Sequence, residues 1–113
     1  MPAVTKAPGS SVRVHDSCTN IGNVPIHLGL APVMRGPVNY GFSVTDYGTL
    51  SPGDSVTVDI MFTIPEEAPA GKYRCYLAVV DLDTGETLEE VDTGWDINVQ
   101  AIKAVEITGI VVE

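Results

Sequence analysis

Turn signals recur along the chain at intervals of roughly eight to twelve residues, and the segments between them alternate between apolar and polar side chains. The alternation is clearest in residues 55–64, which carry apolar side chains at every second position: Val56, Val58, Ile60, Phe62 and Ile64. Because a strand turns successive side chains to opposite faces, this segment predicts a strand with one face in a core. Pro65 ends the segment, since proline has no N–H to give to a sheet.

The same pattern predicts strands in further segments, which cover residues 10–20, 24–30, 38–44, 72–81, 87–99 and 102–112. Two prolines and a glycine near residues 65–71 leave no room for a helix there. The length of 113 residues fits one domain. We therefore predict an all-β protein, an immunoglobulin-like antiparallel β-sandwich of two sheets with about seven or eight strands. An N-terminal arm covers residues 1–9, the sandwich covers 10–99, and an additional C-terminal strand lies within 100–113.

Acidic residues dominate the charge, because fifteen Asp and Glu stand against six Lys and Arg, for a net charge of -9. Phosphate binding needs clustered basic side chains, so this balance argues against binding of nucleic acid or anionic lipid. No apolar run approaches the roughly 18 residues of a membrane span, and the N-terminus lacks the apolar stretch of a secretion signal. We expect a chain that is cytosolic at birth or an excised mature domain. Eleven of the acids lie in residues 66–113, so we expect this half to face solvent and residues 1–65 to be available for docking.

The two cysteines, Cys18 and Cys75, both fall at inward positions of predicted strands. In an immunoglobulin-like sandwich those strands lie in opposite sheets, and a disulfide between them crosses the core. Two buried thiols that act as small apolar side chains are the alternative. Tyr73, two residues before Cys75, occupies the position of the tyrosine corner of such domains.

Few residues could carry chemistry. Asp81, Asp83 and Glu86 form a weak calcium candidate, although a hairpin turn with solvated acids is the favoured interpretation. His15 and His27 are expected to face outward, so they do not complete a zinc site with the cysteines. The chain has no nucleophile elbow and no phosphate loop, and its adjacent acids point to opposite faces of a strand. We expect no enzyme activity, no cofactor and no bound metal.

The aromatic side chains offer a candidate contact surface. Phe62, Tyr73 and Trp95 share parity with apolar neighbours, so we expect all three in the core. The other tyrosines could form a carbohydrate platform or a protein interface, in which tyrosine is enriched. The interface candidates are Tyr40, Tyr47 and Tyr76, together with Ile107, Ile110 and Val112 of the C-terminal segment.

Several loops and strand starts carry a recognisable series of short sequence motifs. It begins at residues 50–58 (Leu-Ser-Pro-Gly-Asp-Ser-Val-Thr-Val) and continues through 62–65 (Phe-Thr-Ile-Pro) to 68–73 (Ala-Pro-Ala-Gly-Lys-Tyr). With the Asn-Ile-Gly-Asn turn at 20–23, it resembles the immunoglobulin-like modules appended to bacterial and archaeal surface proteins and glycosidases. The cell-adhesion-related bacterial domain and the α-galactosidase-associated domain are of this kind. The resemblance covers roughly residues 10–99 and implies a spacer, stalk, adhesive unit or particle decoration.

Immunoglobulin-like domains are also common on tailed-phage virions. The start at a methionine and the extra C-terminal strand depart from the modular pattern and favour a stand-alone assembly subunit. We therefore expect a non-catalytic structural subunit of a virion or extracellular assembly, such as a capsid decoration, tail-associated or filament protein. Its partners would be copies of itself or a larger scaffold such as a capsid or tail, which would hold its terminal segments. The alternative is a cell-surface or carbohydrate-binding module excised from a larger secreted protein.

Overall fold

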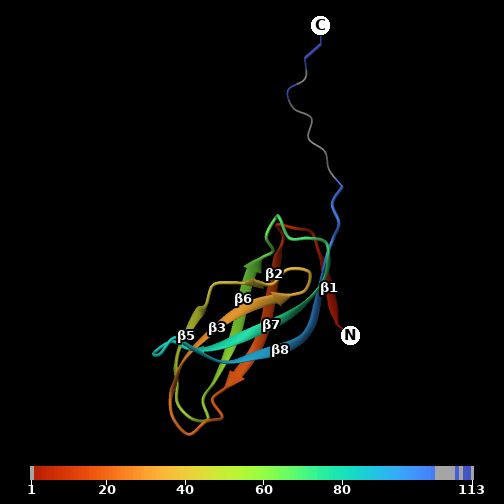
Figure 1. Ribbon diagram of the computed structural model, residues 1–113. Coiled ribbons are helices and arrows are strands. Elements are labelled where there is room, and N and C mark those ends of the chain that lie inside the picture. The colour runs from red at the N-terminus through yellow and green to blue at the C-terminus, as the bar shows by residue number, and fades with distance from the viewer. Residues whose placement is uncertain (1, 104–108, 110, 113) are drawn as a thin grey trace.

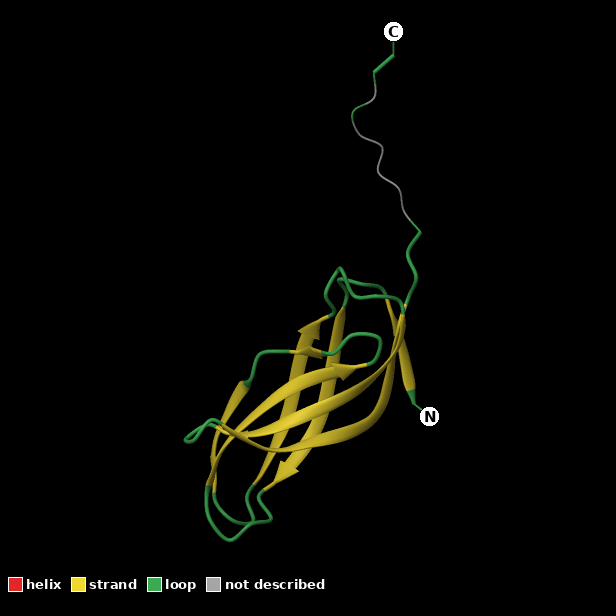
Figure 2. Ribbon diagram, in the orientation of Figure 1, coloured by secondary structure: helices red, strands yellow, loops and turns green. Residues whose placement is uncertain are grey.

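The computed structural model describes residues 2–103, 109, 111 and 112, and within them the chain forms two β-sheets and no helix (Figures 1 and 2). The strands are β1 (Ala3–Lys6), β2 (Ser11–Thr19), β3 (Ile26–Arg35), β4 (Tyr40–Gly41), β5 (Thr45–Leu50), β6 (Ser55–Thr63), β7 (Gly71–Asp81) and β8 (Glu86–Val99). This part of the chain accordingly contains no helix that could span a membrane. The prediction of an all-β protein is confirmed.

The larger sheet has the strand order β1-β8-β7-β3-β4, with β5 also pairing with β3, and the smaller sheet consists of β2 and β6. β1 runs parallel to β8, whereas the other pairs are antiparallel. The two sheets lie face to face, which is the sandwich that the alternation predicts (Figure 1). A two-stranded sheet is too narrow to cover a six-stranded one, and this mismatch shapes the site described below.

The core lies between the sheets and is filled from alternate positions of the strands. On β6, Val58, Ile60 and Phe62 are buried, as the alternation predicts, and Ile64 follows them just after the strand. One group of buried side chains surrounds Tyr73 at one end of the sandwich: Val12, Met34, Phe62, Ile64, Ala68, Cys75, Ile97 and Val99. A second group fills the other end: Leu28, Leu30, Leu50, Val58, Ile60 and Leu77.

The region of residues 38–50 differs from the prediction. The expected strand over 38–44 is reduced to the two residues of β4, and the turn-like Asp-Tyr-Gly at 46–48 lies inside β5. Both short strands pair with the same edge of β3, which continues to Arg35. Pro32 lies where that edge changes partner from β5 to β4, and a residue without an N–H suits such a break.

The termini also differ from the prediction. The expected N-terminal arm forms β1, and the register Val4↔Ile97 places it in the large sheet of its own chain, where no neighbouring subunit is needed to hold it. The expected C-terminal strand over 102–112 lies largely outside the described residues. Its described members are not in a strand, and they are Ile102, Lys103, Gly109, Val111 and Val112.

Candidate binding site on the open side of the sandwich

One side of the sandwich is open. Among the described residues β2 pairs with β6 alone, so its other edge has no partner strand. This free edge faces the β1–β8 margin of the large sheet across a cleft of about 360 Å³. We call it the Trp95 cleft; its apolar lining comes from Val4, Val12, Val14, Cys75, Trp95 and Ile97.

The hydrogen bonds at the two ends of the small sheet show which groups reach the free edge. The Ile64 N–H donates to the Ser10 carbonyl, and the Asn20 N–H donates to the Asp54 carbonyl, both at 2.9 Å. In an antiparallel pair, residues that bond directly across alternate with residues that do not. The even-numbered residues of β2 therefore bond to β6, and the odd-numbered ones direct their N–H and C=O groups to the free edge.

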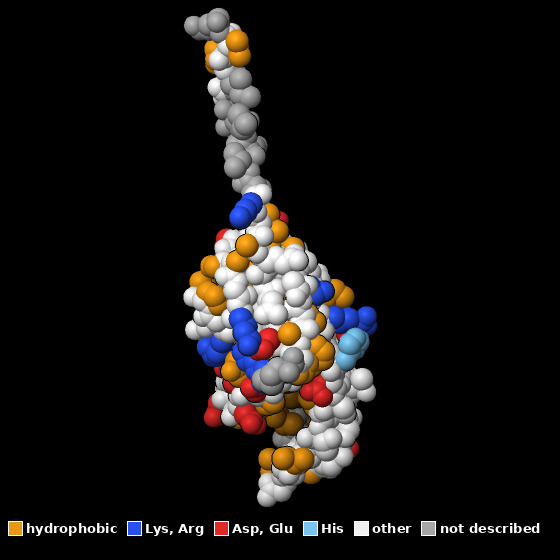
Figure 3. Space-filling model, turned by 90° about the vertical axis from the view of Figure 1, so that its right-hand side faces the viewer, with side chains coloured by type: hydrophobic (Ala, Val, Ile, Leu, Met, Phe, Trp, Pro, Cys, Tyr) orange, Lys and Arg blue, Asp and Glu red, His pale blue; other side chains and the backbone are white. Residues whose placement is uncertain are grey.

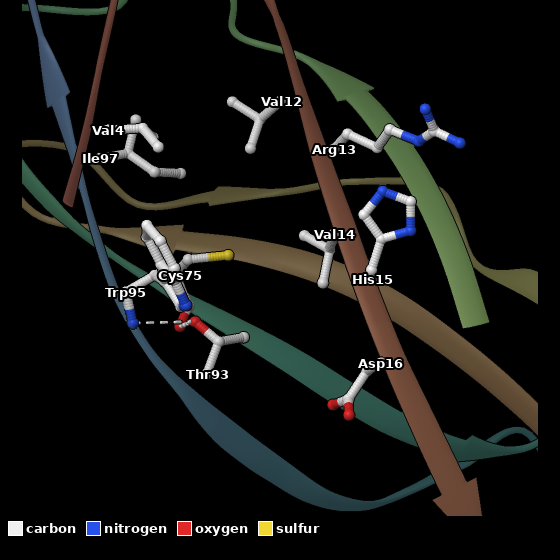
Figure 4. A pocket seen from close by; sticks show the side chains of 10 residues that line it. All are labelled: Val4, Val12, Arg13, Val14, His15, Asp16, Cys75, Thr93, Trp95 and Ile97. Carbon is white, nitrogen blue, oxygen red and sulfur yellow. Dashed lines mark hydrogen bonds between the residues drawn. The ribbon is translucent and has the colours of Figure 1, made fainter. Parts of the chain in front are cut away.

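The side chains of β2 follow the same alternation. Val12 and Val14 point into the cleft, toward Cys75, whereas Arg13 and His15 point away from it (Figure 4). Asp16 stands at the boundary and its Oδ1 accepts the Ser17 N–H at 2.7 Å, which occupies one of the edge groups. The cleft is therefore apolar along β2, with the backbone edge as its main polar feature.

Trp95 corrects the prediction that this side chain lies in the core. Its parity is right, because it shares the inner face of β8 with the buried Ile97, but the indole is 47% exposed. The two-stranded small sheet does not extend over this part of β8, and among the described residues its nearer strand, β2, faces the ring only across the cleft. A register shift in the β7–β8 pairing and the positive φ of Gly94 mark a bulge beside it, and the Gly94 N–H donates to Asp92 Oδ1 at 2.8 Å.

A second groove continues the open side toward the β7–β8 hairpin. It measures about 620 Å³ and combines the inner face of β7 and β8 with the end of β2 and the loop after it. Leu88 and Val91 are exposed in its wall, and Leu77 and Val79 line it more deeply. Figure 3, which views this side of the molecule, shows a hollow lined by hydrophobic side chains. We call it the hairpin groove.

The predicted disulfide is absent, because Cys18 and Cys75 are both free. They sit on opposite sheets as expected, but Cys75 belongs to the group around Tyr73 while Cys18 packs against the group at the other end. Burial raises the pKa of both thiols, so each is kept in its neutral form. Tyr73 makes the bond of a tyrosine corner, since its hydroxyl donates to the Pro69 carbonyl at 2.8 Å.

The tyrosines chosen as interface candidates are scattered. Tyr40 and Tyr47 are half-buried and pack against different groups of core residues, and Tyr76 is half-buried on β7. They do not form one platform. Val112 is exposed, whereas Ile107 and Ile110 lie outside the described residues.

The acids of the hairpin turn hold protein groups. Within the described part of the chain, no group of three or more His, Cys, Asp or Glu side chains is arranged to hold a metal. Asp81 Oδ1 accepts the Asp83 N–H at 3.0 Å, and Asp83 Oδ1 lies 3.0 Å from His27 Nδ1. Asp46 lies 2.9 Å from His27 Nε2 on the other side of the ring. Hydrogen bonds to Asp83 and Asp46 raise the His27 pKa, because both stabilise the imidazolium. Glu86 begins β8.

Ion pairs neutralise much of the acidic half of the sequence on the outer face of the large sheet. Asp96 is buried, which raises its pKa, but the cationic Arg74 and Lys72 outweigh that and hold the pKa below its usual range. Arg74 also donates to Asp92 Oδ1 at 2.8 Å. Asp92 and Asp96 of β8 thus form ion pairs on the face opposite to the open side, whereas Glu89 lines the hairpin groove.

Comparison with known families places the chain. Residues 6–80 match the NPCBM-associated, NEW3 domain of alpha-galactosidase, and this range runs from the end of β1 almost to the end of β7. The chain matches no curated protein. The match supports the glycosidase-associated part of the resemblance and gives no support to a virion protein. Because the match covers more than half of an all-β sandwich, the chain belongs to the family of NPCBM-associated NEW3 domains of alpha-galactosidase.

Proposed function

We propose that the chain is a non-catalytic accessory module of a secreted or cell-surface protein directed at carbohydrate, and that it acts by docking a polypeptide on its open side. The observation that carries this proposal is the uncovered inner face of β8, where Trp95 lines the Trp95 cleft and Leu88 lines the hairpin groove, and both side chains are about half exposed. Large apolar surfaces left bare in this way mark interaction sites. The family match supports the carbohydrate-directed context.

The lining of the cleft favours docking over hydrolysis. Of the described residues that line the Trp95 cleft, Asp16 alone carries a carboxylate, whereas glycoside hydrolysis uses a pair. The hydroxyl of Thr93 donates to the Cys75 carbonyl at 2.8 Å and receives the Trp95 N–H, so it is occupied within the fold. An apolar wall beside an unpaired strand edge suits a peptide chain, whose backbone bonds to the edge while its side chains cover the wall.

Direct binding of a glycan is the second candidate, and the exposure of Trp95 favours it. An indole beside a carboxylate can stack on a sugar ring while the carboxylate accepts hydroxyl hydrogens. The chain contains a single tryptophan, so its fluorescence reports on this site alone. Titration with α-galactosyl oligosaccharides gives a saturable change in emission if a glycan binds there. Loss of that change in Asp16→Ala, with Tyr76→Ala unaffected, would favour the glycan over the polypeptide.

The docking proposal is tested with the hydrophobic dye 8-anilinonaphthalene-1-sulfonate. We expect the folded chain to enhance dye emission, and the double variant Leu88→Ser/Val91→Ser to lower that enhancement severalfold. Val38→Ser, which removes an exposed apolar side chain elsewhere, is the matched control and leaves it unchanged. No enhancement in the folded protein, or equal loss in the control, would contradict an accessible apolar surface on the open side.

A further inference from the structure

Two features of the same chain could each pair with a partner: an open strand edge and an apolar segment. The first is the open side, where the free edge of β2 runs between the Trp95 cleft and the hairpin groove. The second is the segment after β8, whose described apolar residues do not pack on the sandwich: Val111 is 76% and Val112 is 89% exposed. The last backbone bond that ties this end to the sheet joins the Gln100 N–H to the Lys6 carbonyl at 2.9 Å.

We infer that the open side binds residues 104–112 of a second copy of the chain as an added strand on β2. The inference rests on the proposed docking function and names its partner. One copy then presents an acceptor edge and the other a donor segment, and each copy carries both.

The dimensions of donor and acceptor agree. β2 has nine residues, and the donor segment has the same length, so an extended segment spans the whole free edge. The donor is rich in β-branched residues, which favour strands, and contains no proline that would interrupt pairing. The odd-numbered residues of β2 supply the N–H and C=O groups that it would bond.

The side-chain pattern of the donor segment favours one choice of the face that turns toward the two grooves. If Val105, Ile107 and Val111 point inward, they cover the apolar lining of the two grooves, and Gly109 lies between them. The intervening positions then point to the outer face of the small sheet, and they are Ala104, Glu106, Thr108, Ile110 and Val112. That face also carries Arg13 and His15 of β2, both of which lie beside Asp59 of β6. The opposite orientation would bury Glu106 against the grooves.

A second copy is a better donor than the same chain. In the structure the described residues after β8 lead away from the sandwich (Figure 1). Ile102, which precedes the donor segment, is already exposed. Pairing with another molecule covers the exposed apolar residues of both partners and adds a strand to the narrow sheet of each acceptor. Such pairing either closes between two copies or continues along a row of copies.

The acceptor edge can be blocked without touching the pairing of β2 with β6. His15→Pro removes an N–H that points to the free edge, and edge strands tolerate proline there. His15→Ala keeps that N–H and is the matched control. We expect sedimentation equilibrium of the full chain to show reversible association. We expect His15→Pro to weaken it about tenfold or more, and His15→Ala to leave it within about twofold.

The donor can be blocked by substitutions in the segment itself. Ile107→Asp places a charge on the inward side and is expected to abolish association, whereas Thr108→Asp changes the outward side and is expected to retain it. A mixture of His15→Pro and Ile107→Asp is the decisive sample, because the first keeps a donor and the second keeps an acceptor. We expect this mixture to associate although each variant alone does not, with a blue shift of Trp95 emission on mixing.

The outcomes separate this inference from the proposed function. If the full chain stays monomeric at millimolar concentration while the dye still binds the open side, the second-copy donor is wrong and the docking function stands. If Ile107→Asp red-shifts Trp95 emission in a monomeric protein, the segment covers its own domain, which also contradicts the inference. If neither association nor dye binding occurs, both proposals fail.

Discussion

The inner face of the large sheet has two regions that carry similar apolar residues but differ in how far those side chains are buried. Around Tyr73 the small sheet covers it, and Tyr73, Met34 and Ile64 have no exposed surface. Along β8, beyond the free edge of β2, the small sheet does not cover it, and Trp95 and Leu88, which line the open side, stay about half exposed. Trp95 shares the inner-face parity of the buried Ile97, whereas Leu88 lies at a register shift in the β7–β8 pairing. The difference shows that coverage by the second sheet, and not residue type, decides which apolar side chains become core.

The comparison predicts unequal costs for truncating large aromatic side chains. Tyr73→Ala removes a fully buried ring and is expected to lower the free energy of unfolding by about 3–5 kcal/mol. Tyr73→Phe keeps the ring and loses the bond to the Pro69 carbonyl, at a cost of about 1 kcal/mol. Urea unfolding measures both. A loss of unfolding free energy in Trp95→Ala as large as that in Tyr73→Ala would contradict the difference between the covered and the uncovered region.

A smaller effect is expected where the covered region has no room. A Cβ on Gly36 would stand 2.6 Å from the Lys72 carbonyl oxygen and 2.9 Å from Tyr73 Cδ2, so Gly36→Ala forces the backbone to shift. We expect a loss of about 1–3 kcal/mol in urea unfolding. Gly41→Ala is the matched control, because nothing lies within 4 Å of a Cβ there, and it is expected to cost far less. Equal losses would show that the packing around Tyr73 is loose.

The end of the large sheet near His27 depends on charge, and its stability is expected to depend on pH. His27 joins β3 to Asp46 of β5 and Asp83 of the hairpin turn, and these bonds raise its pKa above that of the unfolded chain. The stabilisation is therefore complete below about pH 6.5 and is lost as the pH rises through the folded pKa. Melting temperatures between pH 5.5 and 8.5 are expected to fall in the wild type and to change less in His27→Gln. His15→Gln, as control, keeps the fall. A parallel fall in His27→Gln would contradict this role.

The smallest effect concerns the two thiols. Because Cys18 and Cys75 are free, adding a reductant is expected to leave the melting temperature unchanged. Cys75 is only 2% exposed, although it lines the Trp95 cleft, and Cys18 is half-buried, so a thiol reagent is expected to label Cys18 first in the folded protein. Cys18→Ala and Cys75→Ala assign the two labelling rates. A drop in melting temperature with reductant would instead reveal a disulfide between them.

The sequence predicted the fold where pattern and burial coincide. Alternation in residues 55–64 located β6 and its buried face, and Tyr73 was placed in the core at a tyrosine corner. The prediction from sequence failed for β5. Thr45–Leu50 contains a turn-like Asp-Tyr-Gly, and this segment forms a strand because it pairs with β3. Local propensity does not report a partner that is distant in sequence.

The candidate site was less predictable than the fold. Parity put Trp95 on the inner face correctly, yet it could not show that the small sheet stops short of it. The tyrosines singled out for an interface are spread over the molecule, and the real exposed apolar residues of β8, Leu88 and Val91, carried no signal that separates them from core positions. The exposure of a strand residue depends on what the opposite sheet contributes at that point.

By itself, the sequence determined the main strand segments, which became β2, β3, β6, β7 and β8, and the alternation of apolar side chains along them, because these follow from bonds and side chains within a few residues. Only the tertiary structure decided the partners: β1 joins its own sheet, β2 keeps a free edge, and the two cysteines stay apart. Those outcomes depend on how many strands from distant parts of the chain pair into each sheet. Here six strands face two, and that imbalance creates the open side.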